Sequence, residues 1–319
     1  MAAPGRDDVA GLVEQAREGR PRAVARLISL VEDESPLLRE VSAALSPHTG
    51  TAHVVGLTGS PGVGKSTTTA ALVAALRGRG HRVGVLAVDP TSPFSGGALL
   101  GDRIRMSDHA TDDGVFIRSM ASRGHLGGLS WATPQALRVL DAAGCDVVLL
   151  ETVGVGQSEV EVSGLADTTL VLLAPGMGDG IQASKAGILE IGDVFVINKA
   201  DRDGAQSTRR ELRSVLGMAE RAEGAWKPPI VMTVASRQEG LDDLVEQVDL
   251  HREHLRDSGE LQLRRRDRLR REIRAIALES VRRRVGDLSG HAELDALAQD
   301  VLAGRTDPFS AADRVLSEL

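Results

Sequence analysis

The octet GSPGVGKS at residues 59–66 constrains the fold of this chain more than any other feature. It matches the pattern G-x-x-x-x-G-K-[ST], a loop that cradles phosphate groups between a strand and a helix. An apolar run at 53–58 precedes the octet and a helix-like stretch at 67–76 follows it, in the order that such a loop requires. We therefore expect an α/β fold of the P-loop NTPase class, in which a mainly parallel sheet is flanked by helices.

The octet also predicts a nucleotide site with defined roles for its residues. Its glycines let backbone N–H groups turn towards a phosphate, and the N-terminus of the following helix adds a partial positive charge. Lys65 would reach the β- and γ-phosphates and take part in catalysis, and Ser66 would ligate Mg²⁺. The alternative is a glycine-rich turn that merely contains a lysine. The residues predicted to contact the nucleotide here are Gly59, Ser60, Pro61, Gly62, Val63, Gly64, Lys65, Ser66 and Thr67.

From residue 53 to about 250 the chain alternates apolar strands with helical stretches. The strands are rich in Val, Leu and Ile, which is typical of parallel strands buried on both faces. The pattern divides the chain into an N-terminal helical extension at 1–50, a P-loop domain at 51–250 and a C-terminal helical arm at 251–319, which we expect to serve dimerisation. The expected strands are 54–58, 82–89, 146–152, 169–174, 194–198 and 230–234.

The tetrapeptide at 198–201 follows one of these strands and has the pattern N-K-x-D, which reads guanine in GTPases. The carboxylate of Asp201 can accept hydrogen bonds from guanine N1–H and the 2-amino group. Adenine has neither donor and would leave a buried carboxylate unpaired. We therefore predict GTP and GDP as ligands, with Asn198, Lys199 and Asp201 at the base. Ala235 and Ser236 follow the last strand, where a backbone N–H of GTPases contacts guanine O6.

The segment at 151–157 follows another strand and is expected to sense the γ-phosphate. The carboxylate of Glu151 can hold Mg²⁺ directly or through water, and Gly154 lets a backbone N–H approach the γ-phosphate. Loss of that phosphate would release the segment, as in a nucleotide switch. Glutamate replaces the more frequent aspartate, and no glutamine directly follows Gly154. Gln157 is the candidate for orienting the attacking water, or else a surface helix residue, so slow intrinsic hydrolysis is expected.

Two aspartates complete the predicted metal site. Asp89 ends the second strand, where its carboxylate can point into the crevice, and Asp102 lies in a glycine-rich loop that could close over the nucleotide. Each also has a structural interpretation, since Asp89 precedes a proline in a turn signal and Asp102 could cap a helix. Two further glycine-rich loops, at 118–130 and 175–185, are candidates for moving segments that contact phosphate or a partner.

A family resemblance is carried by the segments 59–66, 88–92, 97–102, 123–129, 151–159 and 198–201. The chain resembles the methylmalonyl-CoA mutase-associated GTPases of the MeaB/ArgK type, over roughly residues 8–260 and more loosely along the arm. The resemblance implies a homodimeric Mg²⁺/GTP switch. Its partner would be an adenosylcobalamin-dependent acyl-CoA mutase, whose cofactor loading it gates and which it protects as a chaperone. It also implies that Mg²⁺ is surrounded by Ser66, Asp89, Asp102 and Glu151.

The chain departs from the usual pattern of this family at three places. Many members have two consecutive basic residues where this chain has Lys185 and Ala186. Many also have an acidic residue at the position of Gly180 and serine at the position of Val234. We expect nucleotide binding to survive these differences, which bear instead on the coupling of hydrolysis to a mutase.

Three other functions compete with a mutase chaperone. A metallochaperone of the nickel- or cobalt-delivery type would favour a Cys/His cluster, but the chain has one Cys, Cys145, and eight His without convincing ligand spacing. A small-molecule kinase or transport ATPase would use ATP, against which N-K-x-D argues. The Arg-rich stretch at 264–284 could contact nucleic acid, but the net charge is -7 and bases would find no aromatic platform.

The sequence predicts a cytoplasmic protein without a membrane contact. The N-terminus lacks the apolar stretch of a signal peptide, and no run approaches the ~18 apolar residues of a membrane span. A single cysteine fits a reducing compartment. Cys145 opens an apolar strand, so we interpret it as a buried small residue and not as a nucleophile.

Overall fold

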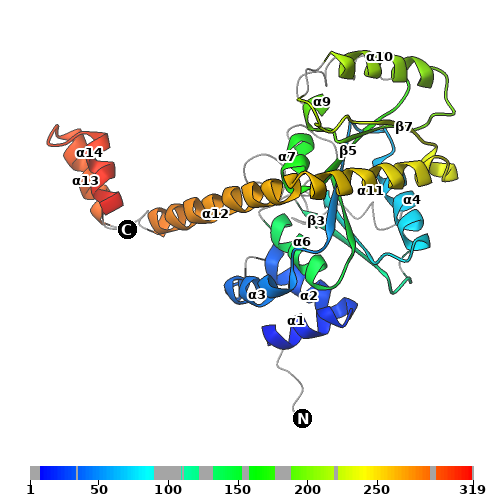
Figure 1. Ribbon diagram of the computed structural model, residues 1–319. Coiled ribbons are helices and arrows are strands. Elements are labelled where there is room, and N and C mark those ends of the chain that lie inside the picture. The colour runs from blue at the N-terminus through cyan, green and yellow to red at the C-terminus, as the bar shows by residue number, and fades with distance from the viewer. Residues whose placement is uncertain are drawn as a thin grey trace, which may run out of the picture. The chain divides into compact units, whose positions relative to one another are not determined.

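The computed structural model describes residues 8–33, 35–89, 109, 111–121, 132–152, 158–176, 188–218, 222–287 and 292–317. The chain forms two compact units, Met1–Leu261 and Gln262–Leu319. The first unit contains the N-terminal helices and the whole sheet (Figure 1). In the residues described, the second unit consists of helices joined by a short turn and contains no strand.

A sheet of seven parallel strands organises the first unit, in the order β3-β2-β4-β1-β5-β6-β7. The expectation of a parallel P-loop sheet flanked by helices is confirmed. The six expected strands are all present, with ends that differ by a residue or two. The strands are β1 His53–Thr58, β2 Val83–Asp89, β3 Val115–Ala121, β4 Val147–Thr152, β5 Thr168–Leu173, β6 Val194–Ile197 and β7 Ile230–Met232.

Strand β3 was not expected, and the placement of Arg118 in a mobile loop was wrong. Arg118 lies in the middle of β3, which pairs with β2 at one edge of the sheet. Its guanidinium donates hydrogen bonds to Ser29 and Glu32 of helix α2. The polar residues of this strand interrupt the kind of apolar run that predicted the other strands. Helix α2 supplies the partners of Arg118, because it packs against β3.

Successive residues of each strand face opposite sides of the sheet, and this alternation assigns the helices to two layers. Val148 and Leu150 of β4 pack in the core under α1, α2, α3, α6 and α7, whereas Val147 and Leu149 pack under α4 and α11. Helices α9 and α10 lie beside β6 (Figure 1). The bounds are α1 Val9–Arg17, α2 Pro21–Glu32, α3 Leu38–Leu45, α4 Lys65–Gly78, α6 Thr133–Ala142, α7 Ser158–Leu165, α9 Ile188–Ile191, α10 Ala205–Gly217 and α11 Leu241–Asp257.

The N-terminal extension is a small helical layer with its own local signals. Asp8 caps α1 by accepting a hydrogen bond from the Gly11 amide at 3.0 Å, and Pro21 begins α2. The sequence predicted a helical extension here, and the described residues of the segment form three α-helices. The connection to β1 contains the short 3₁₀ helix η1, Ser46–His48, and is held to α6 because Asp141 accepts from the amides of Thr51 and Ala52.

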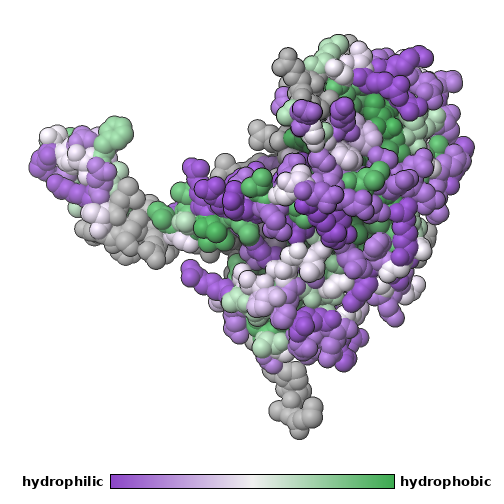
Figure 2. Space-filling view, viewed as in Figure 1, coloured by the Kyte–Doolittle hydropathy of each residue, from purple (hydrophilic) through white to green (hydrophobic). Residues whose placement is uncertain are grey.

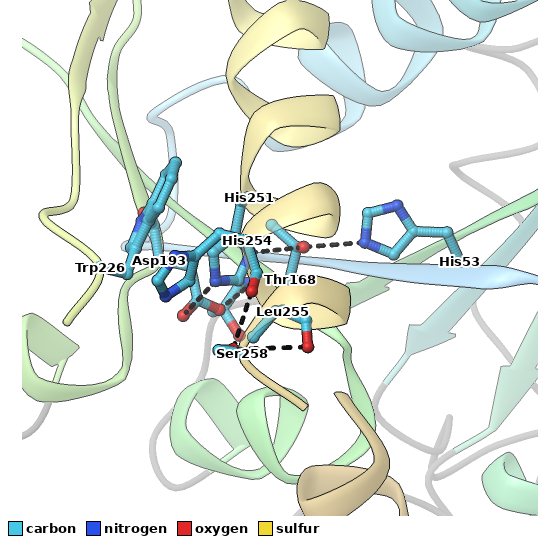
Figure 3. Close-up of polar contacts among 9 residues, drawn as sticks. His53, Thr168, Asp193, Trp226, His251, His254, Leu255 and Ser258 are labelled. Atoms are coloured by element: carbon cyan, nitrogen blue, oxygen red, sulfur yellow. Dashed lines mark hydrogen bonds and ion pairs between the residues drawn. The ribbon is translucent and has the colours of Figure 1, made fainter. Parts of the chain in front are cut away.

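A buried row of polar side chains fixes α11 to the amino ends of β1, β5 and β6 (Figure 3). Thr168 Oγ1 lies 2.8 Å from His53 Nε2 and 2.8 Å from His251 Nδ1. His251 Nε2 lies 3.3 Å from Asp193 Oδ1, and the Trp226 indole donates to the Asp193 carbonyl at 2.7 Å. Because Thr168 has a single hydroxyl proton, it can donate to at most one of the two imidazoles and accepts from any other.

The second unit contains most of α12, Glu260–Asp287, together with α13 Ala292–Leu302 and α14 Pro308–Ser317. The expected helical pattern after residue 251 is confirmed. Hydrophobic and strongly hydrophilic residues are interspersed along α12 (Figure 2). The exposed large hydrophobic residues of α12 are Leu263, Leu269, Ile273, Ile276, Leu278 and Val281. None of the helices in the described ranges has the length and apolar character to span a bilayer.

Candidate functional site

The predicted nucleotide residues meet at the carboxyl edge of the sheet, where ligands of open α/β sheets bind. The octet follows β1, and the register pairs Leu57 of β1 with Glu151 of the neighbouring β4. Asn198 follows β6, which lies on the other side of β5. Three segments far apart in the sequence are therefore side by side at one edge.

The octet forms a loop that ends where α4 begins, at Lys65. The Lys65 ammonium donates hydrogen bonds to the carbonyls of Gly59 at 2.6 Å and Ser60 at 3.3 Å, so the side chain closes the loop on itself. Gly64 has a φ of 98°, and a Cβ there would meet Asn198 Nδ2 at 2.5 Å. A residue with a side chain would be strained by this backbone and would collide with the base motif.

Glu151 lies on β4, and its buried carboxylate contacts the start of α4. Strand alternation turns it to the same face as Val147 and Leu149, towards α4. Its Oε1 accepts from the Ser66 hydroxyl at 2.6 Å and its Oε2 from the Thr69 hydroxyl at 2.9 Å. Only 3% of Glu151 is exposed. Two hydroxyl donors thus offset part of the cost of burying this carboxyl group.

Asn198 braces the phosphate loop against the end of β7. Its Nδ2 donates to the Val63 carbonyl at 2.9 Å. Its Oδ1 accepts from the Ala235 amide at 3.1 Å and from the Thr233 hydroxyl at 3.3 Å. The asparagine is 3% exposed, so its polar atoms depend on these partners.

The other two polar residues of the N-K-x-D motif lie nearer the solvent. Lys199, at a positive φ of 57°, donates from Nζ to the Gly62 carbonyl at 2.6 Å. Asp201 Oδ2 lies 3.0 Å from Arg237 Nη2. Arg237 ends the 3₁₀ helix η3, Ala235–Arg237, whose middle residue Ser236 is exposed.

Several predicted site residues lie outside the described part of the structure. Asp89 is the last residue of β2, but its side chain is not among the described ones. Asp102, Gly154 and Gln157 fall outside the described ranges altogether. So do the departures from the family pattern at Gly180, Lys185 and Ala186. Their roles stay predictions.

Comparison with known families decides what this fold and site belong to. The profile of the family described as methylmalonyl Co-A mutase-associated GTPase MeaB matches residues 24–289. The chain belongs to the MeaB family of GTPases. The match spans α3, the whole sheet and α12, so it includes each segment that carries the candidate site.

Relatives of this MeaB-family GTPase share most of its length. A protein of Pyrococcus abyssi named as a GTPase is 48% identical over 310 residues, which cover 97% of this chain and 96% of that protein. GTPase ArgK of Escherichia coli is 38% identical over 257 residues, 78% of each chain. The mitochondrial methylmalonic aciduria type A homolog of Mus musculus is 36% identical over 266 residues, 82% of this chain and 64% of that protein. A crystal structure of LAO/AO transport system kinase superposes with a TM-score of 0.74 at 28% identity, covering 99% of each chain.

Three residues at the site of this MeaB-family GTPase were not predicted: Thr69, Thr233 and Arg237. Thr69 lies three residues after Ser66 on α4, a spacing that puts both on one face of a helix. That spacing was a usable signal. Thr233 and Arg237 flank the Ala235–Ser236 pair, but their contacts with Asn198 and Asp201 depend on the pairing of β6 with β7.

Proposed function

We propose that this MeaB-family GTPase is a Mg²⁺-dependent, GTP-hydrolysing chaperone of an adenosylcobalamin-dependent acyl-CoA mutase, most simply methylmalonyl-CoA mutase. In this role it gates the loading of the cofactor and protects the mutase. The observation that carries the proposal is the family match over residues 24–289, whose description names the mutase. The mouse relative, a methylmalonic aciduria type A homolog, is in accord with this partner.

The phosphate end of the site supports nucleotide binding and hydrolysis. Lys65 is 7% exposed and its ammonium is already held over the loop by Gly59 and Ser60. This preorganised cation can stabilise negative charge on the β- and γ-phosphates without having to be oriented during the reaction. In the proposal the backbone N–H groups of residues 59–67 contact the phosphates.

The metal end of the site has the donors that Mg²⁺ prefers. Ser66 and Glu151 present a hydroxyl and a carboxylate 2.6 Å apart, and a hard cation such as Mg²⁺ binds oxygen ligands of this kind. We assign these two residues to the metal, together with Asp89 and Asp102. When bound, Mg²⁺ would neutralise charge on the β- and γ-phosphates. Glu151 would bind the metal, the Gly154 amide would contact the γ-phosphate and Gln157 would orient the attacking water.

The base end of the site supports a preference for guanine. Asn198 hydrogen-bonds both the phosphate loop and the segment that follows β7, which supports a proposed base site next to the proposed phosphate site. Asp201 would accept from guanine N1–H and the 2-amino group. In the proposal Lys199 lies along the base, and the turn at Ala235 and Ser236 lies near guanine O6.

The helical arm is proposed to form a homodimer. Among the described side chains of α12, six large hydrophobic ones are exposed, and Ile273 is 65% exposed. Apolar side chains in such number along one helix suggest burial against another chain. A second copy of this protein is the occupant that the family resemblance implies.

GTP turnover by the purified protein tests the proposal, with and without a cobalamin-dependent acyl-CoA mutase from the same source. We expect a slow intrinsic rate that the mutase raises severalfold. A Lys65→Ala variant with the same mutase controls for contaminating GTPases. Tight GTP binding with no stimulation and no complex would retain the GTPase and refute the mutase partner.

A further inference from the structure

Thr69 lies at the carboxylate of Glu151, one turn along α4 from Ser66. Its hydroxyl reaches Glu151 Oε2 at 2.9 Å, while Ser66 reaches Oε1 at 2.6 Å. Thr69 is completely buried. Each oxygen of the carboxylate is therefore held by a different hydroxyl group of the same helix face.

The Thr69 hydroxyl has a second acceptor within reach, the Lys65 carbonyl at 3.1 Å. A hydroxyl has one proton to donate, so the two acceptors compete for it. The carboxylate is the stronger competitor because a hydrogen bond to a charged acceptor is shorter and about twice as strong as a neutral one. The observed distances agree, since the carboxylate is the nearer of the two.

A second donor matters more to a glutamate than to an aspartate at this position. Glutamate has one more methylene, so its carboxylate has one more rotatable bond to immobilise. Rotation about the Cγ–Cδ bond of Glu151 exchanges Oε1 and Oε2, so two donors on different oxygens restrain the carboxylate more than one donor does. The bond from Thr69 fixes that rotation and keeps Oε1 facing Ser66, the residue assigned to the metal.

We propose that Thr69 is a positioning residue of the Mg²⁺ site, which sets the affinity for Mg²⁺ through Glu151. The inference rests on the proposed function, because it takes Ser66 and Glu151 as the metal end of a nucleotide site. Outer-shell partners of metal ligands typically contribute 10–100-fold to metal affinity. Thr69 is such a partner.

The test is the release of a fluorescent GDP analogue from the full-length protein, followed at a series of Mg²⁺ concentrations and in EDTA. In Thr69→Val, which keeps the shape of threonine without its hydroxyl, the Mg²⁺ concentration for half-maximal slowing of release should rise about tenfold or more. Release in EDTA should stay the same within about twofold, because the phosphate loop and base motif are unchanged. Thr69→Ser should restore the wild-type Mg²⁺ dependence.

Thr68→Val is the matched control. Thr68 is also completely buried and donates to a backbone carbonyl of α4's first turn, that of Gly64 at 3.0 Å, but it has no hydrogen bond to Glu151. The Mg²⁺ dependence of Thr68→Val should equal that of the wild type.

A second experiment places Thr69→Val in a Glu151→Gln background. There Thr69→Val should add nothing further, because its effect passes through the carboxylate. Thermal unfolding without nucleotide checks each variant, and Thr69→Ala replaces Thr69→Val if the valine variant does not fold.

The outcomes separate this inference from the proposed function. Equal Mg²⁺ dependence in Thr69→Val and Thr68→Val would overturn the role of Thr69 and leave the GTPase site in place. An equal loss of nucleotide affinity with and without Mg²⁺ would also overturn it, since that pattern indicates a general disturbance of α4. If the rate of GDP release from the wild-type protein did not depend on Mg²⁺, the proposed metal site itself would be refuted, and the inference with it.

Discussion

At the residue scale, the lysine of the phosphate loop is positioned by the loop it serves. Lys65 donates to two loop carbonyls and is nearly buried. Lys65→Ala removes a cation that would contact the phosphates, and interactions of a charged group are worth about 1.5–3 kcal/mol each. We expect GTP affinity to fall at least a hundredfold, with a thermal unfolding curve close to that of the wild type. Titration with a fluorescent GTP analogue measures the loss, and Lys227→Ala, at an exposed lysine, is the control.

In the proposed base site, the specificity for guanine depends on the atoms that Asp201 offers to the base. Asp201→Asn replaces an acceptor by a donor, so preference should move from GTP towards xanthosine nucleotides, which carry an oxygen in place of the 2-amino group. Competition between GTP and xanthosine triphosphate measures the shift. The same substitution disturbs the ion pair with Arg237, an exposed pair worth roughly 0–1 kcal/mol. Arg237→Gln removes only that pair and should retain GTP selectivity. Full GTP selectivity in Asp201→Asn would refute the base-site assignment.

At the element scale, the polar row at the amino ends of the strands holds α11 in place. Thr168→Val removes the hydroxyl that joins His53 to His251 and leaves two buried imidazole nitrogens without that partner. Each unpaired buried group costs about 1–3 kcal/mol. We expect the free energy of unfolding to fall by about 2–4 kcal/mol, measured by urea titration. Thr169→Val, one residue along the same strand, is the control and should cost less. Equal losses in both would show that the hydroxyl of Thr168 contributes nothing specific.

Elements with a strong local pattern could be predicted from the sequence, and those that depend on a partner could not. The octet directly follows β1 and the N-K-x-D motif directly follows β6, two strands whose residues are all buried. Strand β3 contains Arg118, whose partner Glu32 lies on a helix far earlier in the chain. The hydrogen bond from Thr69 to Glu151 could likewise not be predicted without knowing that β4 lies against α4.

At the scale of the whole molecule, the single cysteine reports unfolding of the sheet. Cys145 is buried, as the sequence predicted. Burial raises the pKa of its thiol from 9.0 to about 12; Asp146 and Asp141 add to the rise and Arg82 opposes it. The native thiol should therefore resist a thiol reagent at pH 8. Its labelling rate should follow global unfolding across a urea series, and rapid labelling of the native protein would contradict the burial.

The same pKa shift makes stability depend on alkaline pH. The folded state holds the thiol proton more tightly, so this contribution is complete below about pH 9 and is lost as pH rises towards about 12. At about pH 10.5 the expected loss from this group alone is about 2 kcal/mol. Urea unfolding at pH 8 and at about pH 10.5 measures the decline, which should be smaller by about this amount in Cys145→Ala. An identical decline in both proteins would assign the loss to other groups.

The contacts of Trp226 give this protein a built-in optical signal. The chain contains no tyrosine and only two tryptophans, Trp131 and Trp226. Trp226 lies with its ring centroid 4.9 Å from that of His251 and 5.4 Å from that of His254, both on α11. With Trp131 replaced by phenylalanine, the ultraviolet emission of the protein would come from this one indole. The wavelength and intensity of this emission would then report changes in the packing of α11 in real time, without a dye, when the protein binds a nucleotide or another chain.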